Sequence, residues 1–323
     1  MMSTGTAGEQ QRGRDAEVPS EIPKAGWRDV LLRLKDAIRE DRITLIAAGV
    51  AFYGMLALFP AMIVVVSTYG LVMDPEEIAA QVRTLGVLPD DVRSILTGQL
   101  DALARAPSGR LSLSLAFGVL VALWSVSAGM RALVTGVNAA YSESETRGFV
   151  RLRGLAFVLT IGGSLVTVLA LAVIVALPVA ARRLPGPAGL LVSVLRWPLL
   201  AAVLIAGLAV LYRVAPGRKD ARLQWLSWGS VAATGLLLVA SMLCSLYASY
   251  APAQNKTYGA FFGVIVLLFW LFLSAFAVLL GAELNAELEL QTRRDTTVGP
   301  PQPLGGRGAY VADHVADAPD ASP

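Results

Sequence analysis

Cysteine and histidine are almost absent from this sequence of 323 residues. The one cysteine, Cys244, lies within an apolar run and has no second thiol with which to form an intrachain disulfide. The one histidine, His314, lies in a stretch rich in Gly, Pro, Asp and Ala near the C-terminus. These shortages exclude a metal site built from clustered His and Cys ligands, and they exclude a Ser-His-Asp triad within the apolar part of the chain.

Charged residues are scarce as well. They make up 16% of the chain, against roughly 25% in an average soluble domain, while the hydrophobic share is 55% and the mean hydropathy is +0.61. This deficit is too large for a soluble enzyme with one membrane anchor. The sequence also lacks a GxxxxGKS or GxxxxGKT phosphate loop and a basic groove lined with aromatic residues. We therefore expect a membrane protein that is not an enzyme, with no cofactor, no metal and no nucleic-acid partner.

Long apolar runs take up most of the chain. Each is long enough, or nearly so, to cross the ~30 Å hydrocarbon core of a bilayer as a helix that rises ~1.5 Å per residue. The sequence predicts an all-α polytopic membrane protein with one six-helix domain over residues 24–290. The six predicted spans cover residues 43–72, 111–130, 154–181, 188–212, 224–250 and 258–282.

The two ends of the chain differ from this domain in composition. Residues 1–23 are polar and lack the apolar core of a secretory signal, and residues 291–323 are rich in Gly, Pro and Asp. We expect both to be disordered tails. With six spans they lie on the same side of the membrane, and that side holds most of the 27 Lys and Arg residues. The bias places both termini in the cytoplasm.

Two segments outside the spans have helical patterns. Before the first span, Trp27, Val30, Leu31, Leu34 and Ile38 recur at helical spacing, and charged residues occupy the other faces. This pattern predicts an amphipathic helix at the cytoplasmic interface, although a solvated helix packed on the protein's own loops explains it equally. Between spans one and two, N-cap and proline signals near residues 74 and 89 predict a helical hairpin on the outer surface.

The spans contain few candidate functional side chains. Pro60 lies inside the first span, where it removes one backbone donor and predicts either a hinge or a static kink on the face that it shares with Tyr53. Asn138 and Tyr141 end the second helix, where Asn138 is suited to bond a neighbouring helix. In the sixth span, Gly259 and Gly263 form a GxxxG pair, which fits close packing within the chain or a dimer face.

A group of carboxylates follows the last span. Glu283 and Glu287 are one turn apart and share a helix face, with Asn285 between them. A helix C-terminus disfavours negative charge by ~0.3–1 kcal/mol, so nearby cations are expected. The candidates on the same side of the membrane are Arg131, Arg153 and Arg213. We expect a polar network that joins spans two, four and six, and the alternative is a solvated extension of the last helix.

Four pieces of the sequence, in this order, resemble the YihY/virulence factor BrkB family. The resemblance covers roughly residues 27–290, and it adds Trp124, Pro216 and Tyr258 to the candidate positions. It implies a bacterial inner-membrane protein with six helices and cytoplasmic termini. The four pieces are GVAFYGMLALFP (49–60), ALWSVSAGMRALVTGVNAAY (122–141), YRVAPGRK (212–219) and YGAFFG with LLGAELNAE (258–287).

The resemblance implies several functions for the chain. Some members of the family have carried a tRNA-processing ribonuclease label, which we reject because this sequence offers neither metal ligands nor a basic aromatic groove. Others look like candidate transporters of lipids or envelope precursors. We expect a transporter or lipid-translocating protein that contacts membrane lipids. The alternative is a non-transporting scaffold for envelope integrity, and in either case homo-oligomers or envelope protein partners are expected.

Overall fold

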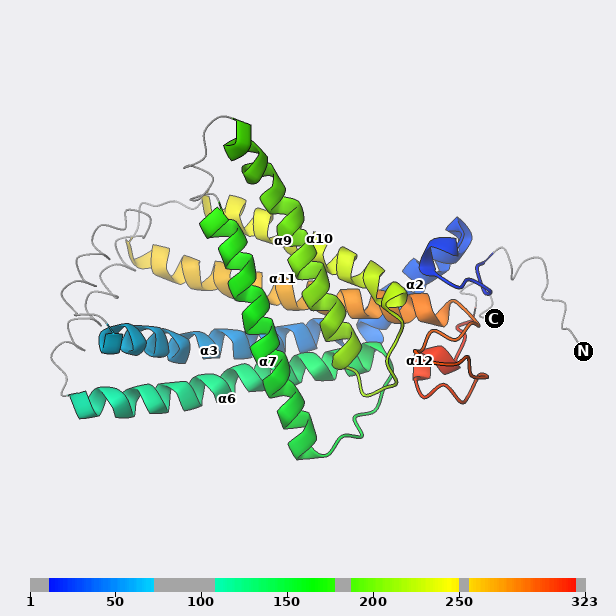
Figure 1. Cartoon of the computed structure of the whole chain (residues 1–323), viewed down its shortest axis with the longest axis horizontal. Helices are drawn as coiled ribbons and strands as arrows, with labels where there is room; N and C mark the ends of the chain where they lie inside the picture. The colour runs from blue at the N-terminus through cyan, green and yellow to red at the C-terminus, as the bar shows by residue number, and fades with distance from the viewer. Residues whose placement is uncertain (1–11, 73–107, 178–186, 250–255, 318–323) are drawn as a thin grey trace, which may run out of the picture.

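The computed structural model describes residues 12–72, 108–177, 187–249 and 256–317, and these residues fold into a bundle of helices without a named strand (Figure 1). The all-α prediction is confirmed for this part of the chain. The long helices are α2 (Lys24–Glu40), α3 (Ile43–Val72), α6 (Ser108–Ala140), α7 (Phe149–Leu171), α9 (Pro187–Val214), α10 (Leu223–Ser249) and α11 (Lys256–Leu290). The short elements are η1 (Pro19–Glu21), η2 (Ala172–Ala176), which is a π-helical turn that continues α7, and α12 (Tyr310–Asp313).

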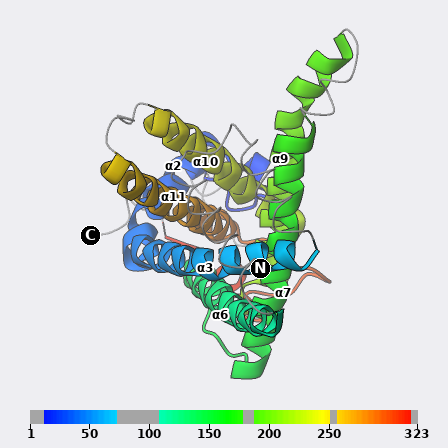
Figure 2. The ribbon, with the colours of Figure 1, turned by 90° about the vertical axis from the view of Figure 1, so that its left-hand side faces the viewer.

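The long helices after α2 form a closed ring. Neighbours in the ring contact one another in the order α3, α6, α7, α9, α10, α11 and back to α3. Helices α3, α6, α10 and α11 run side by side, whereas α7 and α9 cross them steeply on one side (Figures 1 and 2). Because successive helices alternate in direction, the end of the ring where α3 begins is also where α6, α9 and α11 end.

Several of these helices are suited to cross a membrane. Within the described residues, 4 helices are long and apolar enough, and α2 with the start of α3 makes a fifth if this bent pair counts as one span. Many of their outward side chains are large, apolar and exposed, as lipid-facing residues are. A multi-pass membrane protein is therefore supported, whereas the count of six spans and the hairpin stay predictions, the hairpin because residues 73–107 lie outside the described part.

The predicted amphipathic helix is present as α2. It meets α3 at an angle of 59°, and Arg42 at the bend has a positive φ of 52°. Val30 is fully buried and Trp27 and Leu34 pack beside it, but Leu31 is 55% exposed. The helix packs against the end of α11, so its buried face covers the bundle.

Small residues let the ring close tightly at its core. A Cβ added to Gly229 of α10 would overlap the carbonyl oxygen of Gly281 on α11, and a Cβ on Gly281 would lie 2.6 Å from the carbonyl oxygen of Gly229. The two backbones therefore touch at this crossing. Membrane helices associate through such close packing because lipid supplies no hydrophobic force between them.

The prediction of two disordered tails is wrong for residues 12–23 and 291–317. These segments fold onto the end of the ring where α3 begins and α11 ends (Figure 1). The backbone N–H of Arg293 donates to the Arg14 carbonyl at 2.7 Å, and the Thr292 hydroxyl donates to the Ala16 carbonyl at 2.6 Å. Composition predicted disorder because neither segment has an apolar core of its own, but each satisfies the polar groups of the other.

Candidate functional site

The last two turns of α11 carry the most concentrated group of polar side chains. Residues 282–289 are all buried, and Glu283, Asn285, Glu287 and Glu289 lie among them. The predicted alternative, a solvated helix extension, is therefore wrong. We call this region the polar end, defined by these four residues and the side chains that contact them. Burying a carboxylate costs free energy of folding unless the group is paired with a cation or protonated. Glu283, Glu287 and Glu289 therefore each need a partner or a proton.

Glu289 is paired with Arg218, from the loop between α9 and α10. The two side chains form a bidentate ion pair with N–O distances of 2.7 and 2.9 Å, and they are 0% and 1% exposed. Thr296 of the C-terminal segment donates to the same carboxylate at 2.7 Å. The guanidinium also lies 4.0 Å from the centre of the Tyr141 ring. Burial works to lower the pKa of Arg218, but the carboxylate outweighs it and raises that pKa.

Glu287 is paired with Arg33 of α2. The Arg33 Nε donates to the carboxylate at 2.6 Å, and its Nη2 donates to Gln291 at 2.8 Å. Both charged side chains are largely buried, with exposures of 15% and 9%. This pair fastens the amphipathic helix to the end of α11, across 254 positions of sequence.

Glu283 contacts a second carboxyl group instead of a cation. Its side chain is hydrogen-bonded to Asp41, at the bend between α2 and α3. Burial raises the pKa of Asp41 and the neighbouring Glu40 raises it further, and together they outweigh the hydrogen bond from Glu283, which lowers it. Two carboxyl groups in hydrogen-bond contact need one proton between them, because two adjacent buried negative charges repel. The polar end therefore contains a proton-holding pair.

Two further side chains hold the helices together through backbone atoms. Asn285 accepts a hydrogen bond from the Gly229 N–H at 2.7 Å and donates to the Leu226 carbonyl at 3.3 Å, so it joins α11 to α10. The Tyr212 hydroxyl donates to the Val278 carbonyl at 2.7 Å, which joins α9 to α11. Both are structural bonds, because they satisfy buried polar groups on packed helices.

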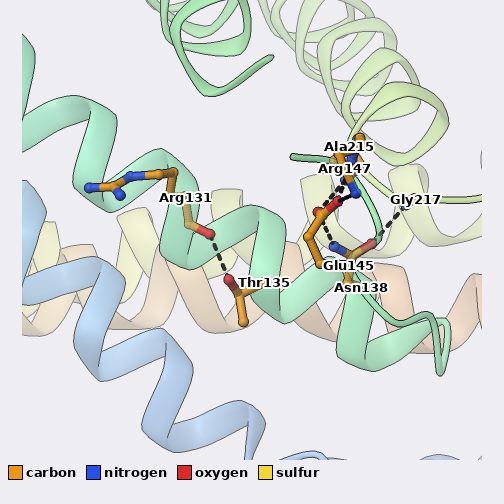
Figure 3. A network of polar contacts seen from close by, with 7 residues as sticks. All are labelled: Arg131, Thr135, Asn138, Glu145, Arg147, Ala215 and Gly217. Carbon is orange, nitrogen blue, oxygen red and sulfur yellow. Dashed lines mark hydrogen bonds and ion pairs between the residues drawn. The ribbon is translucent and has the colours of Figure 1, made fainter. Parts of the chain in front are cut away.

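A second network lies where α6 ends. Asn138 donates to Glu145 at 2.9 Å and accepts from the Gly217 N–H at 2.8 Å, as Figure 3 shows. Arg147 pairs with Glu145 at 2.7 Å and donates to the Ala215 carbonyl at 2.8 Å. The hydrogen bond from Arg147 lowers the pKa of Glu145. Asn138 thus joins α6 to the α9–α10 loop and not directly to a neighbouring helix.

The three arginines predicted to offset Glu283 and Glu287 lie elsewhere. The Arg131 side chain extends away from the Asn138 network (Figure 3), and its Nε has no hydrogen-bond partner among the described residues. Arg153 stacks on Phe149, and Arg213 pairs with Asp220 at 3.2 Å near the surface. Glu287 takes its cation from α2 and Glu283 contacts Asp41, so the cation beside these carboxylates is not one of the three predicted arginines.

The remaining candidates are not gathered at the polar end. Tyr53 of α3 packs near Gly129 of α6, and Pro216 is buried in the α9–α10 loop. Gly263 is exposed, and a Cβ added there would meet nothing within 4 Å, so the predicted close packing within the chain is wrong at this position. Helix α3 continues through position 60, but the side chains of Pro60 and Tyr258 and the surroundings of Gly259 lie outside the described part.

Trp124 lines a groove that opens between α6 and α7. The groove has a volume of about 590 Å³, and Trp124 is 51% exposed in its wall. Ser127 and Arg153 supply polar atoms in an otherwise apolar lining. We call it the α6–α7 groove, and it is lined by Leu120, Trp124, Ser127, Phe149, Val150, Arg153, Gly154 and Phe157.

The sequence analysis offered Glu283 and Glu287 as candidates without the side chains that contact them, and it offered neither member of the Arg218–Glu289 pair. Arg33, Asp41, Tyr212 and Arg218 were not candidates, although Tyr212 and Arg218 both lie within the quoted piece YRVAPGRK. A signal for Arg218 was available, since a guanidinium directly after a Pro-Gly turn lies close to the end of span four. No group of three or more His, Cys, Asp or Glu side chains that could hold a metal ion occurs within the described residues.

A known protein family matches most of this chain. Residues 34–303 match the family described as Virulence factor BrkB, which covers most of the chain and every residue of the polar end except Arg33. The chain belongs to this family. No solved structure matches the chain.

Curated relatives are bacterial proteins. A putative ribonuclease-like protein, YfkH, of Bacillus subtilis (strain 168) is 32% identical over 253 residues, which cover 75% of this chain and 88% of the relative. A UPF0761 membrane protein of Albidiferax ferrireducens is 25% identical over 277 residues, and another, Mpe_A1422 of Methylibium petroleiphilum, is 26% identical over 268 residues. The matches cover 81% and 80% of this chain but 62% of the length of either UPF0761 relative.

Proposed function

We propose that this BrkB-family protein is a transporter of the bacterial inner membrane that moves lipids or lipid-like envelope precursors. In this proposal the chain crosses the membrane six times, with α6 as the span added to those described above. Both termini and the polar end face the cytoplasm. The observation that carries the proposal is the α6–α7 groove.

The groove suits an amphipathic cargo. It lies between two helices of a membrane protein, and its walls are apolar and aromatic except for Ser127 and Arg153. Acyl chains would contact Trp124 and Phe157, while a polar headgroup would lie near the Arg153 guanidinium. Movement along such a groove needs no buried acid relay, which agrees with the scarcity of ionisable residues in the spans.

A non-transporting scaffold is the second candidate function. It is supported by the contacts of the polar end, where the Arg218–Glu289 pair joins the α9–α10 loop to α11 and Asn285 joins α10 to α11. We do not propose a ribonuclease activity, although the Bacillus relative is named as ribonuclease-like. The described residues offer no cluster of ligands for a catalytic metal.

A transfer assay tests the transport proposal. The full-length protein would be reconstituted in vesicles of phosphatidylethanolamine and phosphatidylglycerol that carry a fluorescent phospholipid, and exchange between leaflets would be followed by quenching from outside. We expect the protein to accelerate exchange and Trp124→Ala to slow it several-fold. The matched control is Trp197→Ala, which removes a tryptophan of similar exposure, 54%, outside the groove.

Two results would count against transport. One is the absence of acceleration by the intact protein with phospholipid and lipid-linked precursor probes alike. The other is an equal loss of exchange in the two tryptophan variants. Either result would favour the scaffold function. A deletion strain would then be expected to lose a crosslinked envelope partner without accumulating any one lipid species.

A further inference from the structure

The α6–α7 groove carries positive charge and no negative charge. Arg153 of α7 is its charged side chain, and none of the described residues that line the groove is acidic. Helices α6 and α7 have no Asp or Glu anywhere in their sequences, whereas each has two arginines. A ligand in the groove would therefore meet cations of the protein without carboxylates beside them.

Arg153 has its hydrogen-bond donors available. Within the described residues, the ion pairs are made by other arginines. The guanidinium carbon of Arg153 lies 5.7 Å from the centre of the Phe149 ring. The ring attracts the cation, but it does not accept hydrogen bonds as an oxygen does. A ligand with anionic oxygens can therefore bind Arg153 without displacing a carboxylate of the protein.

A second guanidinium lies next to the groove on α6. The groove residues of α6 are Leu120, Trp124 and Ser127, and Arg131 follows at the same helical spacing, so it continues their face of the helix. The Arg131 side chain extends away from Asn138 and thus toward the earlier turns of α6 (Figure 3). This direction brings its guanidinium toward the residues that line the groove.

Arg131 is also a cation without a counterion inside a long apolar helix. It precedes the end of α6 at Ala140 by about 14 Å along the helix axis. Its Nε is buried, and no described residue accepts a hydrogen bond from it. A buried charged donor without an acceptor costs free energy of folding, and ionisable residues within membrane spans often mark a ligand pathway. An anion at the groove would supply the missing acceptor.

These charges select among lipid headgroups. Arginine donates two parallel hydrogen bonds to phosphate oxygens, so the phosphate of a glycerophospholipid suits Arg153. A zwitterionic headgroup adds an ammonium group, which two guanidinium groups would repel and for which α6 and α7 offer no carboxylate. A headgroup of net negative charge brings the phosphate without that penalty.

We propose that the α6–α7 groove binds glycerophospholipids of net negative charge, with the phosphate held by Arg153 and with Arg131 as a second cation beside it. The acyl chains lie against the apolar and aromatic walls. This inference rests on the proposed function, because it names the substrate class of the same groove. Phosphatidylglycerol is the probe for the preferred lipid, and phosphatidylcholine is the probe for the disfavoured one.

Photolabelling of the full-length protein tests the preference. The protein is placed in phosphatidylcholine nanodiscs that contain a trace of photoactivatable phosphatidylglycerol or phosphatidylcholine with the same reactive acyl chain. Labelled peptides of α6 and α7 are then quantified by mass spectrometry. We expect phosphatidylglycerol to label the groove about tenfold more than phosphatidylcholine, as charged hydrogen bonds to one phosphate would give. Equal labelling by the two lipids would overturn the proposal.

The variants are Arg153→Gln and the matched control Arg151→Gln, which removes the same charge from an exposed position of α7 outside the groove lining. We expect Arg153→Gln to lower phosphatidylglycerol labelling to the level of phosphatidylcholine, and Arg151→Gln to leave it unchanged. Arg131→Gln should lower it in the same direction, and Arg153→Lys, which keeps the charge but loses the fork, should give an intermediate value. Equal losses in Arg153→Gln and Arg151→Gln would contradict the proposal.

Leaflet exchange in vesicles separates this inference from the transport proposal. We expect the intact protein to exchange fluorescent phosphatidylglycerol faster than phosphatidylcholine with the same labelled chain, and Arg153→Gln to lose that difference. Selective labelling without accelerated exchange would support the anionic site and contradict transport. Accelerated exchange with equal rates and equal labelling for the two lipids would support transport and overturn the anionic site.

Discussion

Arg218 and Glu289 face each other with both side chains withdrawn from solvent, joined by two hydrogen bonds of 2.7 and 2.9 Å. The arginine comes from a loop and the glutamate from the end of the last long helix, so the pair fixes the α9–α10 loop against α11. The Tyr141 ring beneath the guanidinium adds the end of α6 to the same contact. One ion pair thereby connects three parts of the ring.

Removing one member of this pair should destabilise the protein strongly. Arg218→Gln would leave the Glu289 carboxylate buried and without its cation, and losses from breaking a buried pair are about 3–5 kcal/mol. The measurement is the free energy of unfolding in mixed micelles titrated with denaturing detergent. Thr296 already donates to the same carboxylate in the intact protein, so its hydrogen bond replaces neither of those lost with Arg218.

The exposed pair Arg213–Asp220 supplies the control. Its side chains are 37% and 52% exposed and 3.2 Å apart, so solvent screens the attraction. Arg213→Gln is expected to cost less than about 1 kcal/mol. Equal effects of the two substitutions would contradict the interpretation that burial makes the Arg218 pair important.

The glycine crossing between α10 and α11 makes a separate prediction. Gly229→Ala would place a methyl group against the backbone carbonyl of Gly281 and against the Asn285 side chain. The backbone oxygen cannot yield as a side chain can, so the helices must separate. Overpacking of this kind costs typically about 1–3 kcal/mol. The readout is the unfolding free energy, together with loss of the Asn285 hydrogen bond to the Gly229 N–H.

Gly235→Ala is the matched control on the same helix. It is exposed, and an added Cβ meets nothing within 4 Å. Alanine favours a helix over glycine by about 1 kcal/mol in water, so this variant should be neutral or slightly more stable. A loss at position 235 equal to that at 229 would contradict the interpretation that close packing against Gly281 makes the first substitution destabilising.

Much of the fold was predictable because its signals are local. The apolar runs placed the start of each long helix within about five residues, although α6 and α11 continue well past the predicted ends at 130 and 282. The helical spacing of Trp27, Val30 and Leu34 identified α2. The carboxylates after residue 282 were recognised because charge there is abrupt. The folded tails were not predicted, because they are stabilised by hydrogen bonds to each other across the length of the chain, such as Arg293 to Arg14.

The sequence could not predict the residues that contact the polar end, for a related reason. Helical spacing tells which residues share a face but not which distant segment packs against it. Arg33 and Glu287 are separated by 254 positions, and the bend at Arg42 sets where α2 reaches α11. Arg131 and Arg213 were chosen because they lie on the expected side of the membrane, which is a weaker criterion than contact.

The carboxyl pair Asp41–Glu283 predicts a dependence of stability on pH. Burial raises the pKa of Asp41 in the folded state and Glu40 raises it further, and these effects outweigh the hydrogen bond from Glu283, which lowers it. Glu287 is a further acidic group that faces Asp41. A carboxyl group with a raised folded pKa stabilises fully below its unfolded pKa of about 4, and that contribution is lost as pH rises through the folded value. Asp41→Asn, which carries no charge, should therefore become more stable than the intact protein as pH increases.

Unfolding temperatures at pH 6 and pH 9 test this expectation. The gain of Asp41→Asn over the intact protein should be larger at pH 9. Asp36→Asn removes a carboxylate from an exposed position on the same amphipathic helix, and its effect should not change with pH. If the unfolding temperatures of the two variants change with pH in the same way, Asp41 and Glu283 do not share a proton.

The C-terminal segment should respond to acid in the opposite direction. Burial raises the pKa of Asp295, but hydrogen bonds from the backbone N–H groups of Gln302 and Thr297 outweigh it and lower that pKa. The backbone N–H of Arg307 and its neighbours likewise outweigh burial and lower the pKa of Asp313. A carboxyl group with a lowered folded pKa stabilises above its unfolded value and loses that effect as pH falls through the folded value.

A spin label at exposed Leu304 would follow the segment. We expect the label to be immobilised at pH 7 and to become mobile as pH falls below about 4, the unfolded pKa of aspartate. Asp295→Asn should give a more mobile label already at pH 7, because the neutral amide accepts more weakly from the two backbone N–H groups. Asp317→Asn, an exposed change in the same segment, should leave the spectrum unchanged. A label that stays immobilised in Asp295→Asn, or that responds equally to both substitutions, would mean that the two tails hold each other without this carboxylate.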